Sequence, residues 1–165
     1  PGHVSDEIRV GCRLEYPTGV SRLTLSAADH QVQPLLDYRF LEEPSDKERL
    51  REGVRECVRL FEDASFNAVI HSRIAPTSED MVSDESLDRW IFANLGIAGH
   101  TSCTCRMGPE SDPFAVVDQR CQVYGVDGLA VIDASVMPDI PRANTNATTI
   151  MIAEKAAEWL SGKPE

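Results

Sequence analysis

The sequence lacks long apolar runs, since its longest continuous apolar stretches are only a handful of residues. A helix that spans a bilayer needs about 20 apolar residues, so the sequence predicts no membrane span. Its first ten residues contain neither a basic segment nor an apolar core, which argues against a secretory signal. We therefore expect a cytoplasmic protein.

Basic residues are scarce. The chain of 165 residues carries 16 Lys and Arg against 27 Asp and Glu, a net charge of −11. A protein that binds nucleic acid presents a basic surface, so this balance excludes nucleic acid as the main partner. Hydrophobic residues make up 42% and charged residues 26%, which is a globular composition. The length fits one domain, or one domain with part of another.

The cysteines are few and odd in number. Five cysteines without a secretory signal indicate reduced thiols, and not a disulfide framework. Cys12 and Cys57 fall on apolar faces and are expected in the core. A zinc module is one alternative, because a histidine and three further cysteines could supply four ligands: His100, Cys103, Cys105 and Cys121. The C-x-C spacing suits such a site poorly, and we expect no metal.

The first part of the sequence predicts an antiparallel sheet. Apolar and polar residues alternate over 7–15, which predicts a strand. Pro17-Thr18-Gly19 is a turn signal, and apolar residues over 20–25 predict a second strand that pairs with the first as a hairpin. Residues 33–40 contain a proline and are expected as an edge strand or an extended loop.

Two helices are predicted in the middle of the sequence. The first covers 46–63, with Ser45 or Asp46 as its cap and Glu48 at the spacing of a capping box. The second covers 84–95, after a capping serine and with acidic residues in its first turn.

The last part of the sequence has a different pattern. Short strands are expected at 115–117 and 122–124, and the four apolar residues 129–132 predict a strand buried on both faces, as in a parallel sheet. A helix over 147–160, apolar nearly all round, is expected to be buried. No G-x-G-x-x-G segment occurs. The last strand and helix therefore look like parts of a sheet whose remaining strands lie outside this sequence.

Two motifs carry candidate chemistry. Residues 99–108 read G-H-T-S-C-T-C-R-M-G, in which His100 is either a catalytic base, a buried structural histidine or a metal ligand. Residues 131–138 read V-I-D-A-S-V-M-P, and a polar N-T-N-A-T-T run follows at 144–149. A carboxylate at the end of a strand beside a helix N-terminus is typical of ligand sites in open α/β sheets, although a capped helix with a polar first turn explains the same residues.

Together these motifs resemble the C-terminal end of the glucose–methanol–choline (GMC) family of flavin-dependent oxidoreductases. The family pattern is a histidine followed by x-x-G-T-C-x-M-G, then D-P, then a stretch from V to D-A-S-x-M-P and an N-x-N or H-x-x segment; this sequence matches it over about 60 residues, with Val126 through Asp133-Ala134-Ser135 and then Met137-Pro138. This sequence departs from it at Cys103, where the family usually has glycine, and in lacking the dinucleotide fingerprint.

The resemblance implies an α+β fold. Residues 1–110 would form part of a substrate-binding domain, an antiparallel sheet covered by helices. Residues 111–165 would complete an FAD-binding domain with a C-terminal strand and helix. The expected partners are a small alcohol substrate and the N-terminal FAD-binding portion.

The resemblance also implies roles for individual residues. The enzyme would oxidise a CH–OH group and pass a hydride to FAD. His100 would be the base, because a neutral imidazole accepts a proton near neutral pH, and Asn144 would hydrogen-bond the substrate oxygen. The residues implied to face the cofactor are Asp133, Ala134, Thr145, Asn146 and Thr148. A non-catalytic fragment that only binds a partner is the remaining alternative.

Overall fold

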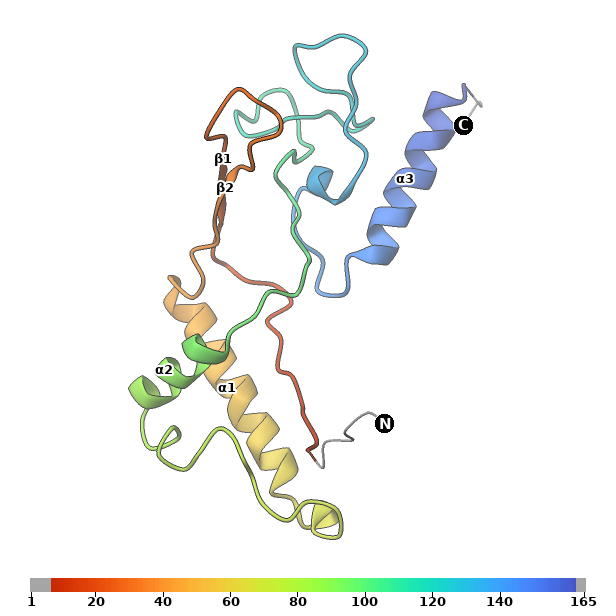
Figure 1. Cartoon of the computed structure of the whole chain (residues 1–165). Helices are drawn as coiled ribbons and strands as arrows, with labels where there is room; N and C mark the ends of the chain where they lie inside the picture. Colours follow the sequence, from red (N-terminus) through yellow and green to blue (C-terminus); the bar gives the residue numbers. More distant parts are fainter. Residues whose placement is uncertain (1–6, 163–165) are drawn as a thin grey trace. The chain divides into compact units, whose positions relative to one another are not determined.

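A computed structural model describes residues 7–162 and divides after Gly96 into two compact units. Figure 1 shows the elements in chain order, which are β1 (Arg22–Thr24), β2 (Leu35–Asp37), α1 (Pro44–Phe61), η1 (Ala64–Phe66), α2 (Asp84–Asn94), η2 (Ala134–Val136) and α3 (Asn146–Leu160). A two-stranded antiparallel sheet and three α-helices confirm the α+β class. The assignment of 1–110 and 111–165 to two functional domains stays a prediction.

The sheet pairs different segments from those predicted. β1 lies within the predicted strand 20–25, but its partner is β2, with Leu23 opposite Leu36. Residues 7–15 are extended and join no sheet, so the predicted hairpin is wrong. Their alternation has another cause, because Cys12 and Leu14 pack against the core between α1 and α2. A period of two shows that alternate side chains are buried, and here helices bury them.

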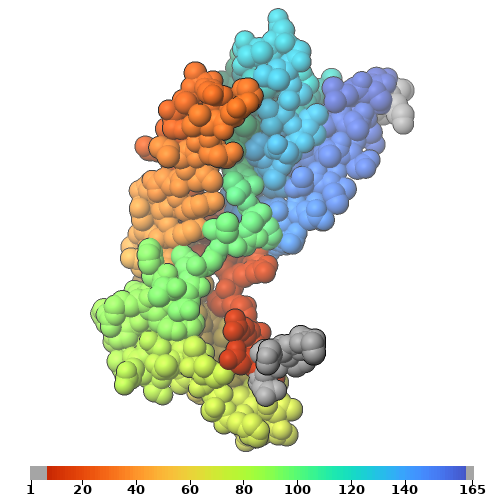
Figure 2. Space-filling model, in the orientation of Figure 1, coloured from red at the N-terminus to blue at the C-terminus, as the bar shows by residue number. Residues whose placement is uncertain are grey.

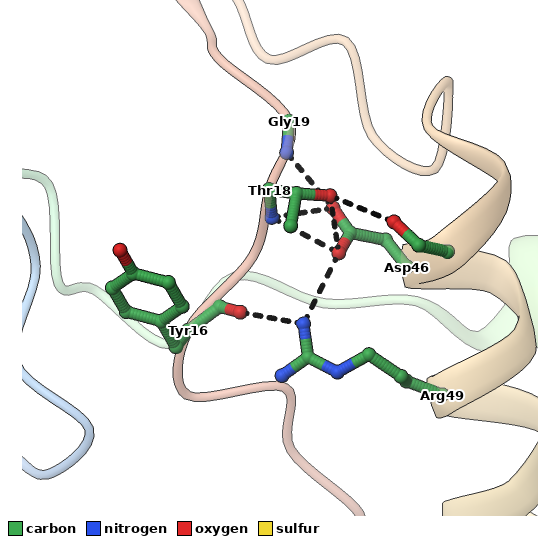
Figure 3. Close-up of polar contacts among 6 residues, drawn as sticks. Tyr16, Thr18, Gly19, Asp46 and Arg49 are labelled. Carbon is green, nitrogen blue, oxygen red and sulfur yellow. Dashed lines mark hydrogen bonds and ion pairs between the residues drawn. The ribbon is translucent and has the colours of Figure 1, made fainter.

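The buried carboxylate of Asp46 binds the segment 17–19 that is predicted as a turn. Asp46 is 3% exposed and accepts hydrogen bonds from the backbone N–H groups of Thr18 and Gly19, both at 2.9 Å (Figure 3). The Thr18 hydroxyl donates to the same carboxylate at 3.0 Å. Arg49 reaches both Asp46, at 3.4 Å, and the carbonyl oxygen of Tyr16, at 2.7 Å. The loop is therefore bound to the first turn of α1 and cannot close a hairpin.

The first two helices form as predicted, with one correction. α1 begins at Pro44, where the missing N–H of proline costs nothing. Ser45 and Asp46 lie inside its first turn, so neither is the cap, and Asp46 binds the loop instead. α2 follows Ser83, whose side chain accepts the backbone N–H of Ser86, as predicted.

The core of the first unit lies between α1 and α2. Leu50 and Val54 of α1 pack with Leu87 and Ile91 of α2, and Leu87 is 0% exposed. At the edge of this core, Arg51 pairs with Asp84 and Asp88 of α2, at 3.5 and 3.0 Å. The apolar residues of each helix are spaced so that they lie on one face, and these two faces are buried against each other.

The second unit holds its core with little regular structure. Val117, Cys121 and Val136 form its buried cluster. The short strands predicted at 115–117 and 122–124 are reduced to single bridges, such as Val117 with Val123. The predicted buried strand 129–132 is wrong for this structure, since Leu129 is 48% exposed and only Ala130 forms a bridge. A strand buried on both faces needs neighbours on both sides, and one bridge supplies only one.

Helix α3 begins one residue before its predicted start, but much of its apolar surface is uncovered. Ile152 and Trp159 pack on the second core, and Ala156 is buried. Ile150 and Met151 are more than half exposed, so the predicted burial of α3 is wrong within this chain. The atoms of α3 are blue in Figure 2. One unit can cover only one side of a helix that is apolar on all sides. Among the residues described, no helix has the length and apolarity needed to cross a membrane.

Candidate active site

The two motifs singled out in the sequence lie against each other. A short ladder of backbone hydrogen bonds joins the segment after His100 to η2. Cys103 N–H donates to the carbonyl of Ala134 at 3.4 Å, Cys105 N–H to that of Ser135 at 2.9 Å, and Met107 N–H to that of Val136 at 2.8 Å. The loop that carries the histidine is therefore fixed to the segment that begins with the predicted carboxylate.

The two predicted catalytic residues meet. The Nδ2 atom of Asn144 lies 3.3 Å from Nε2 of His100. The Oδ1 atom of Asn144 accepts the backbone N–H of Asn146 at 2.9 Å, which fixes which end of the amide faces the histidine. Because an amide nitrogen only donates, this contact is a hydrogen bond when Nε2 of His100 is the acceptor, in the tautomer that carries its proton on Nδ1. Thr145, the residue before α3, makes no side-chain capping bond, whereas Asn144 supplies a side-chain acceptor.

The residues implied to face the cofactor lie on two segments of the same unit. Asp133 precedes η2, and its Oδ1 accepts the backbone N–H of Ser135 at 2.8 Å. The carbonyl of Ala134 belongs to the ladder described above. Thr145 is buried, 8% exposed, and its carbonyl accepts both the N–H and the hydroxyl of Thr149.

Asn146 and Thr148 lie in the first turn of α3, directly after Asn144. The first N–H groups of a helix have no partner within the helix and carry partial positive charge. The site therefore combines a histidine, an oriented amide and a helix N-terminus.

Cys103 has a backbone conformation that favours glycine. Its φ is +68°, in the left-handed region. A side chain there costs about 1–2 kcal/mol, which glycine avoids. The GMC pattern usually has glycine at this position, and the structure gives the physical reason for it.

The zinc alternative has no support in the described part of the chain. No three His, Cys, Asp or Glu side chains among residues 7–162 are placed to share a metal ion. Cys121 lies in the buried cluster of the second unit, and burial, together with Asp118, raises the pKa of its thiol. His100 contacts Asn144 instead.

An apolar groove beside α3 is a feature that the sequence patterns did not predict. It has a volume of about 320 Å³ and is lined by residues that include Met137, Met151, Ile152, Lys155 and Trp159. The Nε1 atom of Trp159 is buried and has no hydrogen-bond partner among the described residues. The signal in the sequence is the spacing of Met151, Lys155 and Trp159, four residues apart on one helix face.

Comparison with known proteins decides the family. A family model described as GMC oxidoreductase matches residues 17–153, most of the chain. The chain belongs to the GMC oxidoreductase family. The matched range includes both His100 and Asn144. The resemblance inferred from the motifs is therefore confirmed.

Curated relatives of this GMC oxidoreductase chain include choline dehydrogenases. It is 38% identical over 146 residues to an oxygen-dependent choline dehydrogenase of Photobacterium profundum, with 88% of this chain and 26% of the relative covered. It is 40% identical over 147 residues to the mitochondrial choline dehydrogenase of Homo sapiens, covering 89% and 25%. The chain thus spans about a quarter of the length of these relatives.

Solved structures with the same fold include two oxidases. Pyridoxine 4-oxidase from Mesorbium loti superimposes with a TM-score of 0.83 and 25% identity, covering 92% of this chain and 29% of that one. A fungal aryl-alcohol oxidase gives a TM-score of 0.76 and 33% identity, covering 89% and 25%. The fold of the GMC oxidoreductase chain is therefore that of the corresponding part of these enzymes.

Proposed function

We propose that this chain is the C-terminal substrate-binding and catalytic part of a flavin-dependent alcohol oxidoreductase. The enzyme would oxidise a CH–OH group of a small alcohol, and FAD, when bound, would supply the hydride acceptor. The observation that carries the proposal is the contact of 3.3 Å between Nε2 of His100 and Nδ2 of Asn144. The membership in the GMC family supports it.

His100 would act as the base. Its Nε2 accepts a hydrogen bond from Asn144, so the lone pair needed to take a hydroxyl proton is present on that atom. A substrate hydroxyl would take the place of the Asn144 amide at this single lone pair, donate its proton to Nε2 and accept a hydrogen bond from Nδ2. A positioned base of this kind contributes a rate factor of about 10²–10⁴.

Asn144 would bind the substrate oxygen. Its amide is held by the backbone N–H of Asn146, so Nδ2 stays directed to the point where His100 receives the proton. As the hydroxyl proton leaves, negative charge grows on the oxygen, and a preoriented N–H stabilises that charge. Base and donor would therefore act on one oxygen atom from two separate loops.

The residues near α3 suit one edge of a flavin. The backbone N–H of Asn146 is already bound by Asn144, but the next N–H groups of the first turn and the side chains of Asn146 and Thr148 offer donors to ring carbonyl and ring nitrogen atoms. The positive end of the helix dipole would favour the negative charge that reduction places on the ring. Ala134 belongs to the backbone ladder that joins η2 to the histidine loop, and Asp133 directly precedes it. We assign these residues, with Thr145, as the contribution of this chain to FAD binding.

The remaining FAD contacts would come from the N-terminal portion of the enzyme. The chain covers about a quarter of its curated relatives and contains no G-x-G-x-x-G segment. The uncovered apolar residues of α3, Ile150 and Met151, support a large partner surface there. We propose that the N-terminal portion covers this face.

The test is reduction of the bound flavin by alcohols under anaerobic conditions. The complete enzyme would be mixed with choline, an aryl alcohol and pyridoxine, the classes named in its relatives and structural neighbours. Bleaching of the oxidised flavin absorbance by at least one small alcohol is expected. Full flavin content without reduction by any alcohol of a broad panel would contradict the proposal.

A further inference from the structure

Two cysteine side chains meet in the first unit. Cys12 lies in the extended segment before β1, and Cys57 lies in α1. The Cys57 thiol lies near enough to that of Cys12 to contribute to its raised pKa. Both cysteines are free and only partly buried. The two thiols therefore lie close together on residues that are partly exposed.

A glycine makes this contact possible. A Cβ atom placed on Gly53 would lie only 2.3 Å from Sγ of Cys12, so the Cys12 sulfur occupies the space that any other residue would fill. Gly53 and Cys57 are four residues apart on α1 and share one face. Side chains of a helix point toward its N-terminus, so that of Cys57 points back toward Gly53.

The core fixes the position of the pair. Cys12 packs against the cluster of Leu50, Val54, Leu87 and Ile91. Leu14 packs on the same cluster two residues later, so the extended segment is anchored on both sides of Arg13. An S–S bond forms only between cysteines whose backbones already lie close together, because its geometry is strict. The Cys12 sulfur lies against Gly53, one helical turn before Cys57, so the backbones of the two cysteines are near each other.

We propose that Cys12 and Cys57 are a modification site, at which hydrogen peroxide forms a reversible disulfide between the segment before β1 and α1. The Cys57 thiolate attacks one peroxide oxygen, the O–O bond breaks, and Cys57 sulfenic acid and one water form. The Cys12 sulfur then attacks the Cys57 sulfur, the S–O bond breaks, and the second water leaves with the Cys12 proton. Two thiols lose two electrons, and one peroxide becomes two waters.

The surroundings of Cys12 suit it to the second step. Burial, with Cys57 close by, raises the pKa of the Cys12 thiol, so Cys12 carries the proton that leaves with the second water. A dithiol such as dithiothreitol would reverse the bond by thiol–disulfide exchange.

The test is peptide mapping of the complete enzyme after treatment with hydrogen peroxide. Remaining thiols are alkylated, the protein is digested without reduction, and linked peptides are identified by mass spectrometry. A peptide pair joined through Cys12 and Cys57 is expected, lost with dithiothreitol, absent in Cys57→Ser and retained in the control Cys121→Ser. The oxidised enzyme should also melt about 5 °C higher, because the bond restricts the unfolded chain.

Gly53→Ala provides a test in which both thiols remain. Its new methyl group takes the position of the Cys12 sulfur, while alanine favours the helix. The rate of Cys12–Cys57 linkage should fall at least fivefold. The proposal would be overturned if Cys12 and Cys57 of the peroxide-treated wild type were recovered as alkylated thiols. It would also be overturned if either cysteine formed a disulfide mainly with another cysteine. An unchanged linkage rate in Gly53→Ala would overturn it as well.

Discussion

Replacement of Asp46 by alanine should release the loop at residues 16–19 from α1. Asp46 accepts hydrogen bonds from Thr18 N–H and Gly19 N–H at 2.9 Å and from the Thr18 hydroxyl at 3.0 Å. Hydrogen bonds to a charged group contribute about 1.5–3 kcal/mol each, but Thr18 is exposed and water replaces part of the loss. We expect the free energy of opening the loop to fall by about 3 kcal/mol, or roughly 150-fold in the opening equilibrium.

Amide hydrogen exchange measures this directly. The amides of Thr18 and Gly19 in Asp46→Ala should exchange roughly 150-fold faster than in the wild type, since local opening governs their protection. Asp63→Ala is the matched control. Asp63 also accepts a backbone N–H, that of Ser65 at 2.9 Å, but lies at the far end of α1. Exchange at Thr18 and Gly19 within threefold of the wild type in Asp46→Ala would refute the reasoning.

The same carboxylate predicts the effect of acid. Burial would raise the pKa of Asp46, but hydrogen bonds from Thr18 and Gly19 and the charge of Arg49 outweigh it and lower the pKa below its ordinary value. A lowered pKa in the folded state means stability that is fully present above about pH 4, the unfolded value, and is lost as pH falls through the folded value. Protection of Thr18 and Gly19 should be constant from pH 5 to about pH 7 after correction for intrinsic exchange, and should decrease below about pH 4.

Three further sets of substitutions test the packing and the backbone by thermal unfolding. Cys103→Gly should raise the melting temperature and Cys103→Val should lower it, because Cys103 has a φ of +68°; Cys105→Gly, at a position without positive φ, should lower it. Ser83→Ala should cost about 1 kcal/mol through loss of the cap of α2, and Ser83→Thr should retain most of it. Leu87→Ala should cost about 2–5 kcal/mol, whereas Leu60→Ala, at a position 51% exposed, should cost far less. The opposite order within any pair would contradict the stated cause.

The elements that could be predicted are those set by local rules. α1 and α2 follow from one apolar face and, for α2, from the Ser83 cap, and the structure contains both. The contact between His100 and Asn144 agrees with the roles implied by the GMC resemblance, although spacing alone could not bring them together. The ladder that starts between Cys103 and Ala134, next to the histidine loop, is a long-range backbone contact without a sequence signature.

The errors have physical causes. Apolar and polar residues alternate over 7–15 as in a strand. The apolar side chains are buried by helices instead of by a second sheet layer, because Cys12 and Leu14 pack beside Leu50. The turn signal before β1 is a local pattern, whereas Asp46 determines the conformation of Thr18 and Gly19 from a distant helix. The burial predicted for α3 and for 129–132 depends on surfaces that this chain does not itself supply.

The rate of flavin reduction in His100→Ala tests the central claim most directly. In the complete enzyme, the rate constant from anaerobic stopped-flow mixing with the best alcohol would be normalised to bound flavin. Loss of the base should lower it by about 10²–10⁴-fold, and Asn144→Ala should lower it by less. The control His71→Ala removes an exposed histidine of the other unit and should leave the rate unchanged. A normalised rate in His100→Ala within threefold of the wild type would contradict the account.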